Sequence, residues 1–229
     1  MKRTGYLPLD KGKFLRGLGL FAGISEASIS SLASASRVLR YPKGSTIFFQ
    51  EDPAEALYLV HKGTVAIVLT SSDGRELVIN EMRDGDLFGE LAILTGQPRS
   101  SGALATTEAE VLLVPRQVFM SVVENEPKVA QRLLELTAQR LSASSGREGA
   151  LAFMDAEARL AKVLLEQEAH SCDVGFLTIS QEELARHTGL TRQTVAKSLG
   201  RWRRAGWLLT GRGKIVLLDR AAIAEIEKK

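Results

Sequence analysis

Hydrophobic and polar residues alternate over short distances between Tyr41 and Pro115. Apolar runs of three to six residues are separated by turn signals in which a glycine follows a lysine or an aspartate. Short apolar runs with glycine turns at regular spacing are typical of antiparallel strands in a small roll or barrel. The residues before about position 40 show only weak helical character. The predicted strands are Thr46–Phe49, Leu57–Val60, Thr64–Leu69, Glu76–Ile79, Ala103–Ala105 and Val111–Val114.

The hydrophobic period changes after Pro115, where the strand pattern stops. A long helix is predicted from about Pro127 to Met154, because its apolar and small residues recur at alternating steps of four and three. This heptad seam, although polar residues interrupt it, favours a helix that pairs with a second copy of the chain. A helix that packs on its own roll is the alternative. The seam positions are Ala130, Leu134, Thr137, Leu141, Ser144, Glu148 and Leu151.

A helix-turn-helix is predicted in the C-terminal part of the chain. Ser180-Gln181-Glu182-Glu183 has the spacing of a capping box at the start of a helix that ends at Thr188-Gly189. Thr191 can cap a second helix, which runs to about Arg204. Two short helices joined by a glycine-containing turn form this motif.

The segments that flank the helix-turn-helix complete a second domain, which begins at Asp155 with an amphipathic helix. A loop over His170–Gly175 and a short strand over Phe176–Ile179 precede the motif. After it, Trp207–Thr210 and Ile215–Leu218 predict a β-hairpin, or wing, whose turn carries Arg212 and Lys214.

Basic residues are concentrated in this domain. The formal net charge of the 229 residues is only +3, but the span from Arg186 to Leu218 contains eight arginines and lysines and no aspartate or glutamate. A one-signed segment in a folded region indicates a polyanionic partner, with a solvated basic face as the alternative on charge alone. Together with the helix-turn-helix and the wing, it predicts binding to double-stranded DNA.

The most specific chemical pattern lies between Phe88 and Ser101. Glu90 and Arg99 stand nine residues apart in a segment that is otherwise largely apolar and contains glycine turns. Backbone N–H groups beside Gly89 would face a phosphate, and Arg99 would neutralise its charge. Glu90 would accept a hydrogen bond from a ribose hydroxyl. The alternative is a salt bridge between Glu90 and Arg99 with no ligand. Stability alone is a poor reason for such a pair, because replacing a buried ion pair by apolar residues is often neutral. The pattern therefore predicts a site for a sugar phosphate.

Composition excludes several classes of protein. With 45% hydrophobic and 25% charged residues and no apolar run long enough to cross a bilayer, we expect a cytoplasmic protein without a membrane partner. The single Cys172 excludes an intramolecular disulfide and a four-thiolate cluster, and the three scattered histidines predict no metal site. No nucleophile–base pair or P-loop is visible, so we expect no enzyme.

The order of roll, long helix and winged helix-turn-helix resembles the CRP/FNR transcription regulators, and within them the cAMP receptor protein branch. The resemblance runs from about Leu18 to Leu218 and rests on Gly85-Asp86-Leu87-Phe88-Gly89-Glu90 and Pro98-Arg99-Ser100, with further matches at Arg140-Leu141 and Leu151-Ala152-Phe153-Met154-Asp155. It implies an α+β fold, a homodimer, a palindromic DNA site and contacts with RNA polymerase. The expected domains are a β-roll (jelly roll) over 1–126, a dimerisation helix over 127–154 and a winged helix-turn-helix over 155–229.

The resemblance also implies that cAMP acts as an allosteric effector, with cGMP as the alternative because Ser100 could serve a guanine amino group. Ser144 and Ser145 match the positions from which the family's two long helices contact the base. The first is usually threonine in the members that bind cAMP, which leaves the choice of base open. The implied ligand-binding residues are Gly89, Glu90, Leu91, Arg99, Ser100, Ser101, Ser144 and Ser145.

On the second helix of the motif, Arg192, Gln193 and Lys197 match the three family positions that reach base edges. Arg192 and Lys197 would contact guanine, and Gln193 would read adenine N6 and N7. The family branch commonly has glutamate and arginine at the last two positions, so its usual half-site is not expected, and a phosphate contact is the alternative for Lys197. The expected phosphate anchors are Thr191, Thr194, Arg201, Arg212 and Lys214.

Other functions fit parts of this pattern. A regulator of this family could bind DNA without a nucleotide or sense another effector. Haem sensing is disfavoured because the chain has no convincing haem ligand, and His61 is the one histidine left open for that role. A module that only oligomerises is disfavoured by the basic span that lacks acidic residues.

Overall fold

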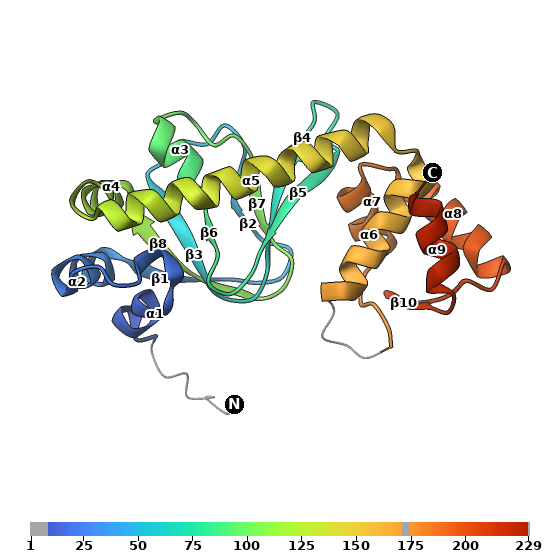
Figure 1. The fold of residues 1–229 in the computed structure, drawn as a ribbon, viewed down its shortest axis with the longest axis horizontal. Helices are drawn as coiled ribbons and strands as arrows, with labels where there is room; N and C mark the ends of the chain where they lie inside the picture. Colours follow the sequence, from blue (N-terminus) through green and yellow to red (C-terminus); the bar gives the residue numbers. More distant parts are fainter. Residues whose placement is uncertain (1–8, 171–174, 229) are drawn as a thin grey trace. The chain divides into compact units, whose positions relative to one another are not determined.

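The computed structural model describes residues 9–170 and 175–228 (Figure 1). The chain divides into two compact units. The first contains the described residues up to Leu69 together with Asn80–Leu141, and the second contains Thr70–Ile79 together with the described residues from Ser142 onward. The predicted α+β fold, with antiparallel sheets, a long helix and a C-terminal helix-turn-helix, is confirmed.

Short helices open the first unit. Asp10 caps α1 by accepting from the backbone N–H of Lys13, and Ser25 caps α2 by accepting from that of Ser28. Apolar residues on one face of each helix, such as Leu15 and Leu32, are fully buried in the core of this unit. The weak helical pattern of the sequence therefore corresponds to α1 (Lys11–Gly17), η1 (Gly19–Phe21) and α2 (Glu26–Ala35).

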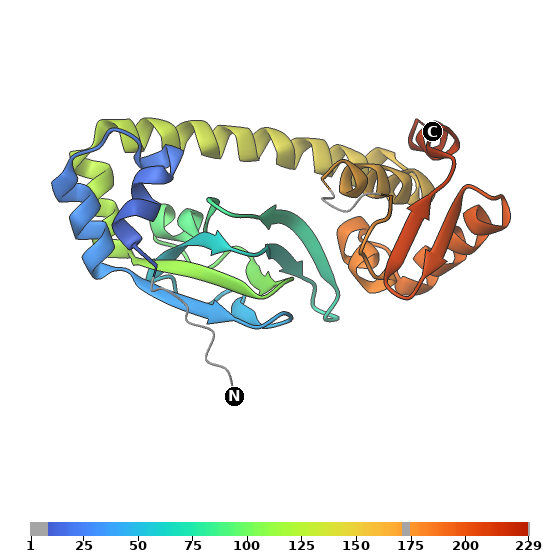
Figure 2. The same ribbon diagram turned by 90° about the horizontal axis from the view of Figure 1, so that it is seen from below.

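Two antiparallel sheets of four strands form the roll in the described part of the chain (Figure 2). Each predicted strand is present, but β1 and β6 were not predicted. β1 is an edge strand with a largely exposed burial pattern, and β6 has two residues, so neither leaves a hydrophobic alternation in the sequence. One sheet has the order β1 (Arg37–Tyr41), β8 (Ala109–Pro115), β3 (Ala56–Lys62), β6 (Leu87–Phe88), and the other β2 (Thr46–Phe48), β7 (Gly102–Ala105), β4 (Val65–Thr70), β5 (Glu76–Met82).

Two consecutive helices follow the roll. The sequence predicted only the second, α5 (Pro127–Phe153), because α4 (Arg116–Asn125) is short and buries only Phe119 and Val122. Val129 and Leu133 on α5 join the same hydrophobic core as these two residues. The N-terminal part of α5 is therefore anchored to the roll.

The second unit contains the predicted helix-turn-helix. The capping box is confirmed, since Ser180 Oγ accepts from Glu183 N at 3.1 Å and Ser180 N donates to Glu183 Oε2 at 2.7 Å. Trp202 is fully buried in the core of this unit. The elements are α6 (Ala156–His170), α7 (Gln181–Thr188), α8 (Arg192–Arg204), β9 (Leu208–Gly211), β10 (Lys214–Leu217) and α9 (Arg220–Glu227).

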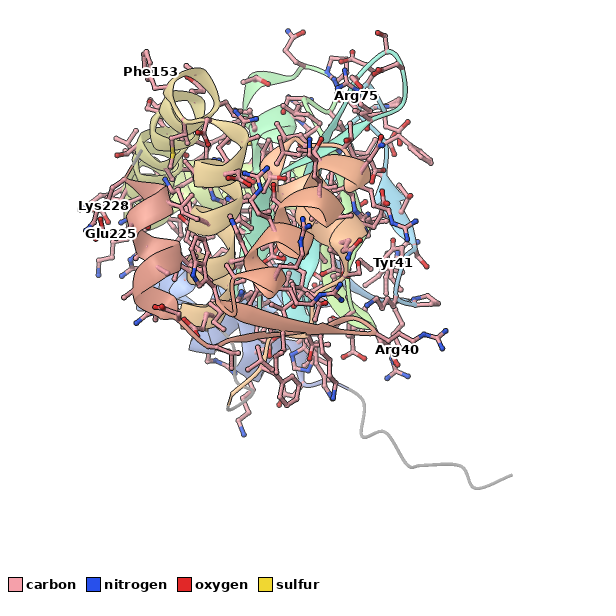
Figure 3. The ribbon with its side chains drawn as sticks, turned by 90° about the vertical axis from the view of Figure 1, so that its right-hand side faces the viewer. Arg40, Tyr41, Arg75, Phe153, Glu225 and Lys228 are labelled. Carbon is pink, nitrogen blue, oxygen red and sulfur yellow. The ribbon has the colours of Figure 1, made fainter. Side chains whose placement is uncertain are left out.

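Two details of this unit differ from the sequence prediction. The strand predicted over Phe176–Ile179 is reduced to a single bridge between Leu177 and Ile215, because no neighbouring strand continues the ladder. The final helix α9, on which Figure 3 labels Glu225, was not predicted. Most of the loop predicted over His170–Gly175, including Cys172, lies outside the described residues.

Candidate ligand site and nucleic-acid interface

The turn between β6 and α3 (Glu90–Thr95) brings a guanidinium against the backbone. Gly89 caps α3 in the left-handed conformation, with φ of 76°. A Cβ atom at this position would lie 2.6 Å from Nη1 of Arg99 and 3.6 Å from the ring of Phe48. Only glycine therefore combines this backbone conformation with the close approach of Arg99.

Arg99 is buried, with 3% of its surface exposed. Its Nη1 donates to the carbonyl of Gly89 at 2.7 Å, and its Nη2 donates to the carbonyl of Ala56. Burial lowers the pKa of the guanidinium, but an arginine remains charged at neutral pH. Its Nε is buried and has no hydrogen-bond partner among the described residues. A buried donor of this kind is normally paired, and an anionic oxygen of a ligand would pair it.

Glu90 pairs with Arg140 rather than with Arg99. Its Oε1 accepts from Arg140 Nη1 at 2.6 Å, and Arg140 Nη2 also donates to the carbonyl of Leu87. The predicted alternative, a salt bridge between Glu90 and Arg99, is therefore not formed, since Arg99 donates to two backbone carbonyls instead. Sequence reasoning missed Arg140 as a site residue because it lies 50 positions further along the chain, on α5.

The remaining predicted ligand residues fall into two groups. Leu91 and Ser100 are exposed and Ser101 is half-buried, each next to or within two residues of Glu90 or Arg99. Ser144 and Ser145 lie on the part of α5 that belongs to the second unit, where Ser144 Oγ is 3.3 Å from Glu148 Oε1. The structure thus assembles Gly89, Glu90 and Arg99 with Arg140 in one unit.

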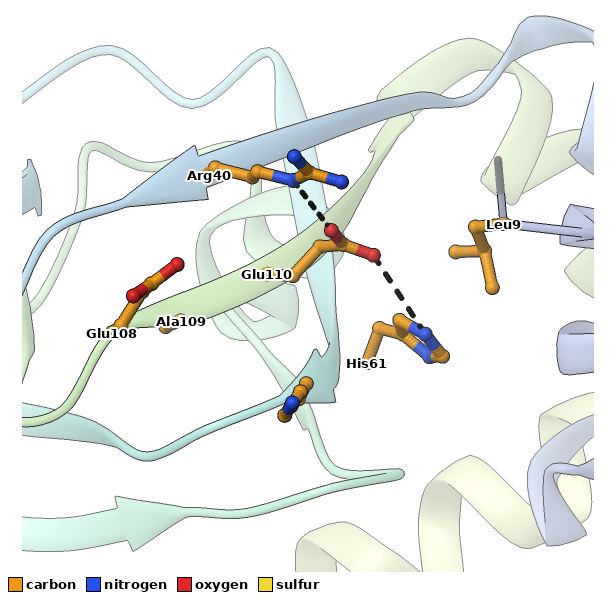
Figure 4. Close-up of a pocket in the computed structure, with 7 residues that line it drawn as sticks. Leu9, Arg40, His61, Glu108, Ala109 and Glu110 are labelled. Atoms are coloured by element: carbon orange, nitrogen blue, oxygen red, sulfur yellow. Dashed lines mark hydrogen bonds and ion pairs between the residues drawn. The ribbon is translucent and has the colours of Figure 1, made fainter. Parts of the chain in front are cut away.

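His61, the residue left open as a haem ligand, lines a separate pocket of about 370 Å³ (Figure 4). His61 Nε2 lies 3.7 Å from Glu110 Oε1, and Glu110 Oε2 accepts from Arg40 Nε at 2.7 Å. Charged side chains thus dominate this lining, whereas cofactor sites are lined mainly by apolar ones. The described residues contain no group of three or more histidine, cysteine or acidic side chains that could hold a metal ion.

The recognition helix α8 presents its candidate base-reading residues to solvent. Thr191 caps the helix by accepting from the backbone N–H of Thr194 at 3.1 Å. Four residues of α8 are buried in the core of this unit, while Arg192, Gln193 and Lys197 are exposed. Because Gln193 and Lys197 are four residues apart, they lie on the same face of the helix.

Some predicted phosphate anchors already have partners within the chain. Arg201 Nη1 lies 2.9 Å from Glu157 Oε2, and Lys214 Nζ lies 4.3 Å from the centre of the Phe176 ring. The side chain of Arg201 is 55% exposed, so this ion pair contributes little to stability. Arg212 is exposed at the tip of the wing.

Comparison with known proteins identifies the family. The cyclic nucleotide-binding domain model matches residues 38–126, and the Crp-like helix-turn-helix domain model matches residues 158–226. The CRP-like cAMP-activated global transcriptional regulator of Mycobacterium tuberculosis is 32% identical over 213 residues, or 90% of this chain and 95% of the relative. The chain belongs to the CRP/FNR family, whose members are transcription regulators and not enzymes. It is a DNA-binding regulator with a cyclic nucleotide-binding domain.

Solved structures agree with this assignment. The c-di-GMP responsive global regulator CLP of Xanthomonas campestris is 26% identical, with a TM-score of 0.76 over 84% of this chain and 99% of that one. A putative crp/fnr regulator from Eubacterium rectale shares the fold, with a TM-score of 0.82 at 21% identity over 93% of this chain and 99% of the other. None of the helices described is long and apolar enough to cross a membrane.

Proposed function

We propose that this protein is a homodimer that binds cAMP and, in that state, recognises a palindromic DNA site. The observation that carries the proposal is the buried guanidinium of Arg99, which is held against Gly89 and has an unpaired Nε among the described residues. A buried cation with a free donor beside a glycine turn suits the cyclic phosphate of a nucleotide. Glu90 accepts the ribose hydroxyl, and Ser100 and Ser101 add donors next to Arg99.

Homodimerisation through α5 is supported by the exposure of its predicted seam. Leu134, Leu141 and Leu151 are 71%, 68% and 42% exposed, although they are large and apolar. On the same helix Val129 and Leu133 are buried against the roll. In this proposal one face of α5 packs against the roll, and the exposed leucine seam packs against the same seam of a second copy of the chain.

The effector acts on DNA binding through α5 in this proposal. Glu90 is hydrogen-bonded to Arg140, which lies one residue before Leu141 of the seam. Nucleotide binding at Glu90 and Arg99 therefore biases the position of the paired helices, while Ser144 and Ser145 complete the contact with the base. The two recognition helices then lie about 34 Å apart, one turn of DNA. This switch requires the DNA-competent state to bind the nucleotide more tightly.

RNA polymerase is the further partner that we propose, on the ground that the family consists of transcription regulators. No metal takes part in this mechanism.

Calorimetric titration of the purified chain with cAMP and cGMP tests the effector assignment. We expect saturable binding of cAMP with one site per subunit and weaker binding of cGMP. Absence of heat and of competition from either nucleotide at high micromolar concentration would contradict the proposal.

A second candidate effector is a guanine nucleotide. Ser100 is exposed beside Arg99 and can accept from a guanine amino group, and one structural relative is described as c-di-GMP responsive. The same titration series, extended to c-di-GMP, separates the two candidates by the ratio of affinities.

A further inference from the structure

Arg99 is held by an aromatic cluster as well as by hydrogen bonds. Its Cζ atom lies 4.2 Å from the centre of the Phe48 ring and 5.7 Å from that of Tyr58. A desolvated guanidinium over an aromatic face is attracted by the electrons of the ring, and this attraction is stronger inside a protein than in water. Phe48 therefore compensates part of the cost of burying this charge.

The Phe48 ring is fixed in its orientation. It stacks on Tyr58, with ring centres 5.5 Å apart, and on Phe88, with ring centres 6.1 Å apart. Tyr58 and Phe88 are paired across β3 and β6 and stack on each other at 5.1 Å. All three aromatic side chains are at most 8% exposed. A ring packed in this way keeps its face toward the guanidinium that lies over it.

The segment after Phe48 also fixes the backbone of Arg99. Glu51 N donates to the carbonyl of Arg99 at 2.9 Å, and Arg99 N donates to the carbonyl of Asp52 at 3.0 Å. Glu51 has a φ of 68° and is the only non-glycine residue with positive φ among the described residues. A positive φ is strained for a residue other than glycine, and it persists only where the surrounding structure imposes it. Such positions cluster at binding sites.

We propose that Phe48 is a positioning residue for the effector site. Its ring sets the plane of the Arg99 guanidinium, so that Nη1 of Arg99 donates to the Gly89 carbonyl and an edge of the guanidinium faces the nucleotide phosphate. This inference rests on the proposed function, because it assigns the phosphate to Arg99. Phe48 and the segment that follows it act together on Arg99. The Phe48 ring sets the plane of the guanidinium, and the segment through Asp52 fixes the backbone from which the Arg99 side chain extends.

A set of variants of the full-length chain tests this inference by calorimetric titration with cAMP. Phe48→Leu keeps an apolar side chain but removes the aromatic face, and Phe48→Tyr keeps the face. Phe119→Leu is the matched control, because it removes a fully buried aromatic ring from the core of the same unit. If Phe48→Leu fails to fold, Phe48→Met replaces it.

We expect Phe48→Leu to weaken cAMP binding about tenfold, the effect of losing a desolvated cation–π contact, while Phe48→Tyr and Phe119→Leu keep the wild-type affinity. In the Arg99→Lys background, the Phe48→Leu effect shrinks to less than about threefold, because the planar group that it orients is gone. Equal losses in the two backgrounds, or a Phe48→Leu variant with native affinity, overturn the positioning role alone. Absence of cAMP binding by the wild-type chain overturns the proposed function together with it.

Discussion

Arg140 Nη1 donates to Glu90 Oε1 over 2.6 Å, so that a side chain of the long helix α5 holds the carboxylate assigned to the effector's ribose. Both side chains are largely shielded from solvent, with 21% and 11% exposed. The hydrogen bond joins the roll to the helix on which the dimer is proposed to form. It therefore connects the proposed effector site with the proposed dimer helix.

Arg140→Met should destabilise the protein because it leaves the Glu90 carboxylate without its charged partner. We expect the free energy of unfolding to fall by about 1–3 kcal/mol at pH 7. Chemical denaturation measures this change. Arg147→Met on the same helix is the control, and it should change the stability by less than about 0.5 kcal/mol. An equal loss in the two variants would show that the hydrogen bond to Glu90 adds nothing.

Arg99→Lys tests the role of the guanidinium itself. Lysine keeps the charge but loses the planar fork that donates to Gly89 and Ala56 while facing a phosphate. We expect cAMP affinity to fall by about tenfold to a hundredfold, and titration calorimetry measures it. Unchanged affinity would mean that the phosphate binds elsewhere.

Glu51→Gly should stabilise the protein, because glycine adopts a φ of 68° without steric cost. The gain is up to about 1 kcal/mol, or a rise in Tm of about 2–4 °C for a chain of this size. Glu124→Gly, in the exposed face of α4, is the control and should lower the Tm. Thermal denaturation followed by circular dichroism distinguishes the two, and a lower Tm for Glu51→Gly would contradict the assignment of strain.

The stability of the protein should depend on Glu126 at acid pH. Hydrogen bonds from the side chains of Ser25 and Ser28 and from the backbone of Ser25 hold the pKa of this carboxyl below its ordinary value of 4.5. A lowered pKa contributes stability that is present above the ordinary value and is lost as the pH falls through the folded value.

Glu126→Gln should accordingly lose less stability than the wild type between about pH 5 and pH 2. Denaturant titrations at several pH values check this, with Glu124→Gln, near the end of α4, as the control. Parallel acid limbs for the wild type and Glu126→Gln would refute the prediction.

Arg192 and Arg212 should differ in their effects on DNA binding. Arg192→Ala removes a candidate base contact on α8 and should cost about 1–3 kcal/mol on the cognate site while relaxing its sequence preference. Arg212→Ala removes a candidate phosphate anchor on the wing, and should weaken binding to all sequences equally and lower the salt slope by about one. Fluorescence anisotropy on cognate and scrambled duplexes separates these outcomes. Identical behaviour of the two variants would contradict the assignment of roles.

Local patterns in the sequence predicted most of the fold. The capping box of Ser180 and Glu183 was predicted correctly because both of its hydrogen bonds close within three residues. The alternation of buried Leu177 and Ile179 was also real, yet it gave no strand, because only Leu177 finds a backbone partner. A hydrophobic alternation indicates which side chains are buried, whereas a strand also needs a neighbouring strand with which its backbone can form hydrogen bonds.

The candidate site was predictable only as far as its chemistry is local. Glu90 and Arg99 stand close together in the sequence with their glycine, but the partners that hold them do not. Arg140 reaches Glu90 from 50 positions away, and Phe48 reaches Arg99 from the end of β2. No spacing rule connects such residues, because their proximity results from the packing of α5 on the roll and from the position of β2 within the roll.

The measurement that tests the central claim most directly is DNA binding with and without cAMP. Selection of duplexes from a random pool by the wild-type chain, followed by anisotropy on the selected sequence, gives the affinity in both conditions. We predict a palindromic site that is bound at least tenfold more tightly in the presence of cAMP, and a response that Arg99→Lys strongly reduces. Equal affinity with and without cAMP, or an undiminished response in Arg99→Lys, would contradict this account.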